Sequence, residues 1–549
     1  MRKLVWAVTA CLLATVALGV TACGDDDDDG GGGGKGGAEL KVVSSGLDNA
    51  DPVLYQTVQA NQVFQLVYTP LVTYKHVEGT AGAEIVPGLA EEVPEPTNGG
   101  KTYKFQLREG LKYSDGTAVK ASDFENTIKR LLKLGSVWSS FYSGIVGADE
   151  FTEKGDFSAD IPGIETNDDT GEITVNLTEP DTKVLFALAE PYASPMPAAK
   201  APGKSLKQPP PGTGPYTVDV VDFSRLYKLA RNPNFADLPG IPKGNFDTIT
   251  VTVSDNVTKD TQDVIDGKQD FMTEDPTGDL LQQVRQKYAD RYQESSTYPN
   301  VYYHFLNHSL PPFDKLEARQ AVNYAMDSNA LVRVFGGRLT PGCTFLPPAV
   351  VGYKDFECAY GDPAGEPDLD KARQLVKDSG YEGMKVTMWT NNKDPRPAIA
   401  DYTRDMLNEI GFEADIKTLD QQVYFEQVGL KRTKAQIGFT DWYQDFPHPG
   451  DFLDTLLSTD ALKTEVTSNQ GFVSDPKMDA EFDKLRGEDP ADAAEQWGAL
   501  DEYAVNDQAH VLPYGYEESS SFFSERMDAQ NCSALHPVYK NDWSLFCLK

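Results

Sequence analysis

The residue types best suited to binding chemistry gather in one short segment, residues 441–449, which reads DWYQDFPHP. It holds two carboxylates, Asp441 and Asp445, together with three aromatic side chains and two prolines. Because proline lacks a backbone N–H and fixes φ, this stretch cannot be a regular helix, and we expect a stiff loop after an apolar strand at 436–439. Loops on rigid scaffolds collect binding groups, and a carboxylate there binds a cation strongly once water is excluded. The segment is therefore the first candidate for a ligand site.

Motifs of catalysis are missing from the sequence. It contains no G-x-S-x-G elbow and no H-E-x-x-H pair, and Ala198 stands where a P-loop ending at Gly203-Lys204-Ser205 needs its first glycine. Gly36 stands where a calcium loop starting in the N-terminal aspartate run would need glutamate. A lipid-anchored hydrolase that uses paired carboxylates is the least favoured function, and we expect no cofactor and no metal site.

Composition excludes a second class of function. The chain has 549 residues, 50 Lys and Arg against 84 Asp and Glu, and a formal net charge of −34. Proteins that bind nucleic acid need clustered cations to displace counterions from the phosphates, so we expect no nucleic-acid partner. The length suggests about three or four structural units, each large enough for its own core.

The N-terminus indicates export. Two cations, an apolar stretch and two small residues predict a signal peptide over residues 1–22. The sequence VTAC, which ends at Cys23, resembles the lipobox of bacterial lipoproteins, and the resemblance implies a lipidated Cys23. Residues 23–38, rich in Asp and Gly, would then form a tether to the membrane. The expected location is the outer face of the bacterial cell membrane, outside the cytoplasm.

Cysteine usage agrees with export. Apart from one cysteine in the signal peptide and Cys23, four remain, and an oxidising compartment favours two disulfides. Four cysteines allow three pairings. We favour the pairing Cys343–Cys358 and Cys532–Cys547, because each of these disulfides closes a short local loop. A zinc site is disfavoured, because none of the four cysteines has C-x-x-C spacing.

The rest of the chain mixes strand-like and helix-like segments and predicts an α/β fold. Runs rich in β-branched and aromatic residues predict strands at 103–107, 173–177, 248–253 and 301–306. Helical spacing predicts helices at 123–134, 370–379 and 398–410, with Ser122 as the N-cap of the first and Gly380 ending the second.

Several segments, in order, resemble family five of the bacterial extracellular solute-binding proteins, the peptide-binding components of ABC transporters. The matching segments are LREGLKYSDGTAVKASDF (107–124), GTGPY (212–216), PPFDKLEARQAVNYAMDSNALVRVFGG (311–337), KARQLVKDSGY (371–381), MLNEIGFEADIKTLD (406–420) and DWYQDFPHPGDFL (441–453). The resemblance implies an α/β, two-lobed, periplasmic-binding-protein-like fold (type II, cluster C) with an extra domain and a hinged cleft.

The resemblance also implies a discontinuous domain layout. Lobe I would comprise residues 39–75, 212–308 and 507–549. Lobe II, the extra domain, would comprise 76–211, and lobe III 309–506.

The resemblance carries site residues with it. In peptide-binding members an aspartate three residues after the tryptophan pairs with the ligand α-ammonium group, and this position is Asp445. Residues Gly438, Thr440, Asp441 and Trp442 would offer main-chain groups to the peptide. The family pattern changes here to Phe446-Pro447-His448, which affects the shape of the pocket.

Two further sets complete the expected site. The turn at 47–52, with Leu47, Asn49 and Asp51, resembles the first ligand-contacting turn of the family. Lys393 and Arg396 follow a strand in a region where cations would meet a ligand carboxylate.

The expected function is that of a monomeric, non-catalytic lipoprotein that captures extracellular peptides and delivers them to the permease subunits of an ABC transporter. One alternative is the same fold binding another solute, such as an oligosaccharide or a metal chelate, although the spacing of His304 and His308 does not suit direct metal binding. A peptide-sensing receptor is a further alternative.

Overall fold

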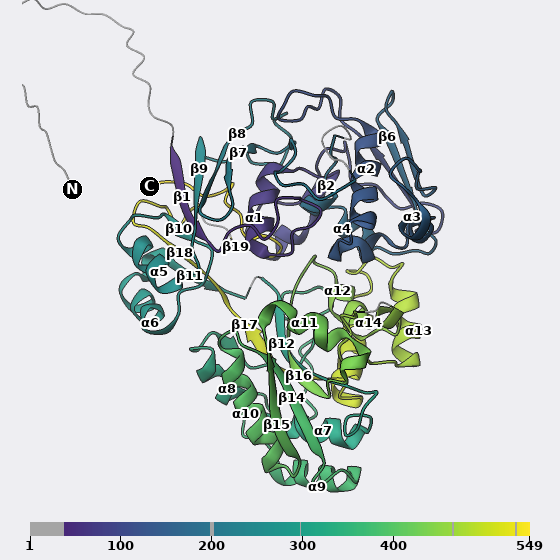
Figure 1. Cartoon of the computed structure of the whole chain (residues 1–549), viewed down its shortest axis with the longest axis vertical. Coiled ribbons are helices and arrows are strands. Elements are labelled where there is room, and N and C mark those ends of the chain that lie inside the picture. The colour runs from purple at the N-terminus through teal and green to yellow at the C-terminus, as the bar shows by residue number, and fades with distance from the viewer. Residues whose placement is uncertain (1–37, 198–202, 297, 464–465, 533–534) are drawn as a thin grey trace, which may run out of the picture. The chain divides into compact units, whose positions relative to one another are not determined.

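The computed structural model describes residues 38–549 except 198–202, 297, 464–465 and 533–534 (Figure 1). The expectations for the signal peptide, Cys23 and the first fifteen positions of the tether lie outside these residues. Within the described part of the chain, no helix is both long and apolar enough to serve as a membrane span.

A seven-stranded sheet has the order β11-β18-β10-β1-β9-β8-β7, in which β1 runs parallel to both β9 and β10. Its strands are β1 (Glu39–Ser44), β7 (Tyr216–Asp222), β8 (Leu226–Arg231), β9 (Thr248–Val253), β10 (Phe271–Met272), β11 (Tyr292–Ser295) and β18 (Ser519–Phe523). The associated helices are α1 (Val58–Val67), α5 (Val257–Ile265) and α6 (Gly278–Lys287).

A six-stranded sheet has the order β13-β17-β12-β16-β14-β15. Its strands are β12 (Asn300–Leu306), β13 (Leu339–Thr340), β14 (Lys385–Asn391), β15 (Glu413–Leu419), β16 (Ile437–Tyr443) and β17 (Val511–Glu517). Around it are α7 (Leu316–Ala325), α8 (Ser328–Val334), α9 (Leu369–Ser379), α10 (Arg396–Glu409), α11 (Gln421–Gly429), α12 (Pro449–Leu457), α13 (Pro476–Leu485) and α14 (Ala494–Glu502).

A three-stranded antiparallel sheet, β4-β6-β5, is formed by residues that lie between β1 and β7 in the sequence. It comprises β4 (Thr102–Gln106), β5 (Ile164–Asn167) and β6 (Glu172–Asn176), with α2 (Ala121–Lys133), α3 (Ala148–Lys154) and α4 (Lys183–Ala187). Two small antiparallel pairs complete the set, β2 (Val72–Tyr74) with β3 (Ile85–Pro87) and β19 (Leu535–His536) with β20 (Lys540–Asn541).

The predicted strands and helices are confirmed at β4, β6, β9, β12, α2, α9 and α10, within a few residues at each end. Gly380 ends α9 with a φ of 76°, a conformation that glycine adopts without strain. The predicted cap of α2 is wrong: Lys120 is the N-cap residue, and the hydroxyl of Ser122 donates to Asp168 instead. The predicted loop at 441–449 is also wrong at its start, because β16 continues through Tyr443.

Sheet membership differs from the expected domain boundaries at two places. β12 and β17 belong to the six-stranded sheet, whereas both lie in the residues expected for lobe I. Boundaries that follow the sheets would fall between 295 and 300 and between 517 and 519. The three-lobe layout remains a proposal, and we prefer these two boundaries for it.

The buried apolar residues form three clusters. The first joins the seven-stranded sheet to the three-stranded sheet, the second surrounds the six-stranded sheet, and a small third one covers the remaining face of the seven-stranded sheet. Phe446 follows β16 of the six-stranded sheet but belongs to the first cluster. The loop after β16 therefore carries one side chain out of its own core and into the neighbouring one.

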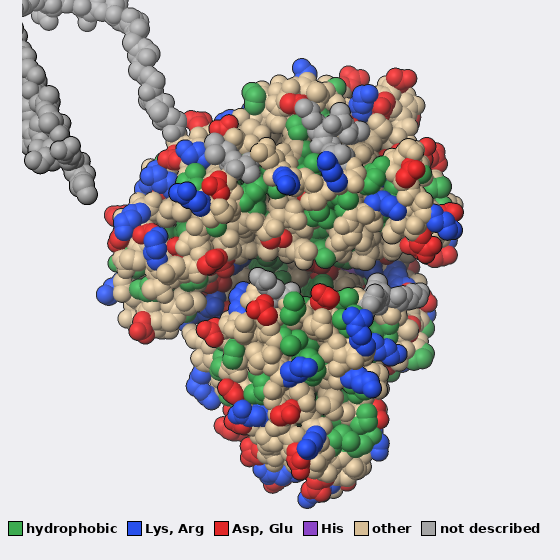
Figure 2. Space-filling model, in the orientation of Figure 1, with side chains coloured by type: hydrophobic (Ala, Val, Ile, Leu, Met, Phe, Trp, Pro, Cys, Tyr) green, Lys and Arg blue, Asp and Glu red, His purple; other side chains and the backbone are tan. Residues whose placement is uncertain are grey.

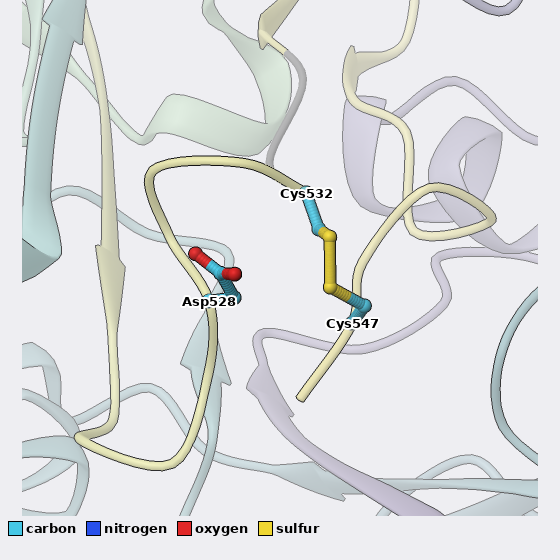
Figure 3. A group of neighbouring side chains, drawn as sticks. All are labelled: Asp528, Cys532 and Cys547. Carbon is cyan, nitrogen blue, oxygen red and sulfur yellow. A yellow bond between two sulfur atoms is a disulfide. The ribbon is translucent and has the colours of Figure 1, made fainter. Parts of the chain in front are cut away.

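Both favoured disulfides are present, Cys343–Cys358 and Cys532–Cys547. The second disulfide lies beside Asp528 (Figure 3). Asp528, Cys532 and Cys547 form the one cluster of three potential metal-binding side chains found in the described residues. Its two sulfur atoms are bonded to each other, and the Asp528 carboxylate accepts hydrogen bonds from Asn531. This group therefore offers no thiolate pair to a metal.

Charged side chains of both signs are interspersed on the face drawn in Figure 2. Surface ion pairs of the described structure include Lys75–Glu84 and Lys101–Glu179, and such exposed pairs contribute little to stability individually.

Asp51 is fully buried in an ion pair with Arg130 of α2. Its carboxylate also accepts the backbone N–H groups of Leu206, at 2.8 Å, and Val53, at 3.3 Å. The pair fastens the turn after β1 to α2. Because burial of a charge is costly unless it is paired, loss of one partner is expected to destabilise the fold strongly.

We predict that Asp51→Ala lowers the free energy of unfolding by about 3–5 kcal/mol, because Arg130 loses its buried carboxylate partner. Urea denaturation followed by circular dichroism measures the change. A variant with unchanged stability and lost ligand binding would contradict this structural role and give Asp51 a role in the ligand site.

Candidate functional site

A cavity of about 50 Å³ lies among side chains from several separate segments of the described chain. The segments are the start of α1, the region after α2, the region after α4, the connection before β12, the loop after β16 and the C-terminal part. The lining residues are Tyr55, Gln56, Thr57, Val58, Asn61, Trp138, Glu190, Tyr192, Tyr298, Gln444, Asp445 and Val538. None of these is Lys, Arg or His.

Asp445 reaches the cavity from the loop between β16 and α12. Its backbone N–H donates to Oδ2 of Asp451 at 2.9 Å. The ring of the next residue, Phe446, packs edge-on against that of Phe141, with the ring centroids 4.9 Å apart. Both contacts fix the loop. Within the described residues, no hydrogen bond or ion pair engages the Asp445 carboxylate, so it is available to a ligand.

Asp451 positions this loop from the first turn of α12. It is fully buried, and its Oδ2 accepts both the Asp445 N–H and, at 3.3 Å, the indole N–H of Trp442. A carboxylate in the first turn is also stabilised by the helix dipole. Sequence reasoning missed this residue, although an Asp two positions after the helix-starting proline is a recognisable N-terminal signal.

Glu190 contributes a second carboxylate, from the turn after α4. Its side chain is buried, and its Oε2 accepts a long hydrogen bond of 3.3 Å from Nδ2 of Asn61. The other oxygen, Oε1, is buried without a hydrogen-bond partner in the described structure. A buried polar atom left in this state is costly, and such atoms often mark functional sites.

Three side-chain N–H groups beside the cavity already donate hydrogen bonds. The indole N–H of Trp138 donates to the backbone oxygen of Tyr55, and Nδ2 of Asn61 donates to Glu190. Nε2 of Gln444 donates to the backbone oxygen of Pro537. Within the described structure, the buried atoms of the lining that have no hydrogen-bond partner are Glu190 Oε1, Asn61 Oδ1, Gln444 Oε1 and the hydroxyls of Tyr55 and Tyr192. The cavity therefore offers three carbonyl-type oxygens as acceptors and two tyrosine hydroxyls that can donate or accept.

Aromatic rings form much of the wall. Trp138 stacks on Tyr192 with ring centroids 4.9 Å apart and an angle of 8°, and Tyr55 lies 6.1 Å from each of them. The negative faces of such rings attract cations. Acceptors, carboxylates and aromatic rings together favour a positively charged ligand group rich in N–H donors.

The cost of holding these carboxylates without a cation is evident in their pKa values. Burial raises the pKa of Asp445 to about 7. Burial also raises the pKa of Glu190 well above its usual range, with the nearby Asp445 charge adding to the effect. Desolvation disfavours the charged form of a carboxyl group, and a bound cation would restore it.

The structure brings part of the expected site together and leaves part elsewhere. Gly438, Thr440, Asp441 and Trp442 lie in β16, where each pairs with a residue of β12. Gly438 also pairs with Trp389 of β14, so both sides of its main chain face strands of the sheet. The Asp441 carboxylate accepts from Arg396 at 2.8 Å, and the Arg396 guanidinium lies over the Phe439 ring.

The expected turn at 47–52 does not line the cavity. Leu47 packs against the first core cluster, Asn49 accepts the N–H of Asp51, and Asp51 pairs with Arg130. The lining residues begin a few positions later, at Tyr55. Lys393 is exposed and is not part of the cavity wall.

Trp138, Glu190 and Tyr192 had no signal in the sequence. No motif surrounds them, and only the packing of distant segments brings them to Asp445.

We predict that Asp445→Asn stabilises the ligand-free protein at pH 8 and does so less as the pH falls. The folded state retains the Asp445 proton to a pH near 7, whereas the unfolded chain releases it near 3.8, so this group removes stability as the pH rises between these values. The expected gain at pH 8 is about 1–2 kcal/mol, less than the full shift implies because the carboxyl is partly open to solvent.

Thermal unfolding at pH 4, 6 and 8 measures this difference. Asp415→Asn, at an exposed position in β15, is the charge-matched control. A variant that is equally or less stable than the parent at pH 8 would contradict the unpaired, desolvated state of Asp445.

Comparison with solved structures shows the fold. "Clavulanic acid biosynthesis oligopeptide binding protein 2" superposes with a TM-score of 0.84 at 24% identity, covering 93% of this chain and 95% of that one. DppA from Helicobacter pylori, solved in complex with the peptide STSA, superposes with a TM-score of 0.74 at 21% identity, covering 93% and 98%. The two-lobed periplasmic-binding fold expected from the sequence is confirmed.

Curated relatives include the glutathione-binding protein GsiB of Escherichia coli O1:K1 / APEC, 28% identical over 364 residues. The match covers 62% of this chain and 64% of that protein, so the chain spans a little under two thirds of the length of the curated relatives it matches.

The family described as "Bacterial extracellular solute-binding proteins, family 5 Middle" matches residues 84–463, well over half of the chain. The resemblance found in the sequence is thereby confirmed, and the chain belongs to family 5 of the bacterial extracellular solute-binding proteins.

Proposed function

We propose that this protein is the substrate-binding lipoprotein of an ABC transporter, that it captures extracellular peptides and that it delivers them to membrane permease subunits. In this proposal Cys23 carries the lipid, residues 23–38 tether the folded part to the membrane, and the chain has no catalytic role. The monomer is its working form.

The observation that carries the proposal is the unpartnered Asp445 carboxylate in a cavity whose lining has no cationic side chain. A peptide α-ammonium group supplies both a positive charge and three N–H donors to such a site. A charge-assisted hydrogen bond formed out of water is among the strongest polar contacts available to a protein. This role agrees with the position of the ammonium-binding aspartate in the family resemblance.

The main chain of β16 supports a peptide rather than an unrelated solute. β16 pairs with β12 along its whole length but with β14 only at Ile437 and Gly438. On the β14 side, residues Thr440–Tyr443 therefore have no strand partner in the described structure. We assign this edge to the peptide backbone, because pairing of main chains gives affinity without selecting particular side chains. We do not include Gly438 among the proposed peptide-binding residues, because strands β12 and β14 flank it on both sides.

A change of conformation must accompany binding. A cavity of about 50 Å³ admits an ammonium group and a few water molecules, whereas ligand pockets typically measure about 300–1,000 Å³. The loop at 444–448 contacts the segment between β4 and β7, where Phe446 packs against Phe141 and His448 bonds Thr182. Separation of these contacts would open the site. We assign peptide uptake to a hinge motion of this kind, with the ligand favouring the closed state.

The charges and aromatic rings of the cavity also indicate how well it would bind solutes other than peptides. Glutathione, which the curated relatives are named for, carries a carboxylate beside its ammonium group, and Asp445 with Glu190 would repel it. An oligosaccharide could stack on Trp138, but it brings no charge for Asp445. A receptor that passes the peptide to a sensor would have the same site, and the binding experiment below does not depend on that difference.

We predict that calorimetry of the purified full chain with a mixed di- to hexapeptide pool shows binding that N-acetylation of the peptides abolishes. Asp445→Asn should weaken binding by about 10- to 100-fold, because the ammonium loses a charged acceptor. Asp415→Asn, which removes the same charge from an exposed position, should bind as the parent does.

An oligosaccharide pool runs in parallel. Binding of this pool alone, or peptide binding that is indifferent to acetylation and to Asp445→Asn, would refute the peptide function of this site.

A further inference from the structure

The proposed contact between the peptide α-ammonium group and Asp445 does not explain why Glu190 is also present in the cavity. Glu190 is 1% exposed, it lines the same cavity as Asp445, and its Oε1 has no hydrogen-bond partner in the described structure. Among the described residues, the one hydrogen bond to its side chain comes from Asn61 at 3.3 Å, beyond the usual range of such bonds. A structural glutamate with this degree of burial would be expected to have its oxygens satisfied.

No residue of the cavity wall balances the charge of Glu190. The lining has two carboxylates and no Lys, Arg or His. Asp451, directly behind Asp445, adds a third carboxylate, and its Oδ1 is also buried without a partner. One ligand ammonium supplies one positive charge, which leaves this group of carboxylates under-compensated.

Resting on the proposed peptide function, we propose that Glu190 selects peptides with a second positive charge close to the α-ammonium, that is, peptides whose first residue is basic. The α-ammonium pairs with Asp445, and the side-chain cation of the first residue pairs with Glu190. The ligand class is thus a basic N-terminal peptide rather than any peptide.

The remaining groups of the cavity suit a second cation. In the part of the chain that the structure describes, Asn61 Oδ1 and the Tyr192 hydroxyl are buried without hydrogen-bond partners and can accept N–H groups from an ammonium or guanidinium. The stacked Trp138 and Tyr192 rings add an aromatic surface that favours a cation over a neutral chain. An acidic first residue would meet repulsion from Glu190 and Asp445, with no cation in the wall to relieve it.

Three tripeptides that differ only in their first residue test the proposal: Lys-Ala-Ala, norleucine-Ala-Ala and Glu-Ala-Ala. Norleucine has the length of lysine without its amine. Calorimetry of the full chain should show that the lysine peptide binds about 10- to 100-fold more tightly than the norleucine peptide, the range of one charge-assisted hydrogen bond. The glutamate peptide should bind more weakly than either.

Glu190→Gln keeps the shape of the side chain and removes its charge. We expect this variant to bind the lysine and norleucine peptides within about 3-fold of each other, with the norleucine affinity near that of the parent. Glu153→Gln, an exposed glutamate of α3, is the matched control and should retain the lysine preference. A melting curve confirms that each variant is folded, and the comparison of peptides on the parent protein does not depend on any variant.

The outcomes separate the two proposals. Equal affinity of the parent for the lysine and norleucine peptides, or a lysine preference that survives Glu190→Gln, overturns the role of Glu190 and leaves the peptide function standing. Failure of all three peptides to bind overturns the peptide function, and the role of Glu190 falls with it.

Discussion

The candidate site depends on one electrostatic constraint: two carboxylates face a small aromatic cavity whose lining, among the described residues, has no Lys, Arg or His side chain. Within the described residues, the Asp445 carboxylate has no hydrogen-bond or ion-pair partner and the Glu190 carboxylate has only Asn61, and burial raises the pKa of both. Desolvated carboxylates are tolerated in a fold when the surrounding structure holds them in place and a ligand compensates them. Here the surrounding structure is the Asp451 carboxylate, which holds the loop by its backbone, and the Phe446 ring, which anchors it in a neighbouring core.

The same loop connects the site to the contacts between sheets. His448 accepts the Gly450 N–H through Nδ1, so its proton is on Nε2, from which it donates to Thr182 at 3.1 Å. Beside it, Asp454 of α12 is paired with both Lys183 of α4 and Arg486. Phe446 and His448 therefore connect this loop to the residues that follow α2 and to those that precede α4.

Sequence alone predicted the α/β class, both disulfides and several strands and helices, because apolar periodicity and glycine stops are local signals. It failed where a side chain had a distant partner: Ser122 bonds Asp168 instead of capping α2, and Asp51 is buried against Arg130. Asp445 could be identified because a motif surrounds it. Glu190 and Trp138 could not, since their role arises only when remote segments meet around the cavity.

The number of protons released when a peptide binds tests the central claim most directly. Calorimetry at pH 6 in two buffers of different ionisation enthalpy measures it. Asp445, Glu190, Tyr55, Tyr192 and Tyr298 line the cavity, and Asp451 lies behind Asp445. At this pH the tyrosines and the peptide α-ammonium keep their protons. With the pKa of Asp445 at about 7, the account predicts release of about one proton or more as the cation restores the carboxylates to their charged form. Binding without proton release would contradict it.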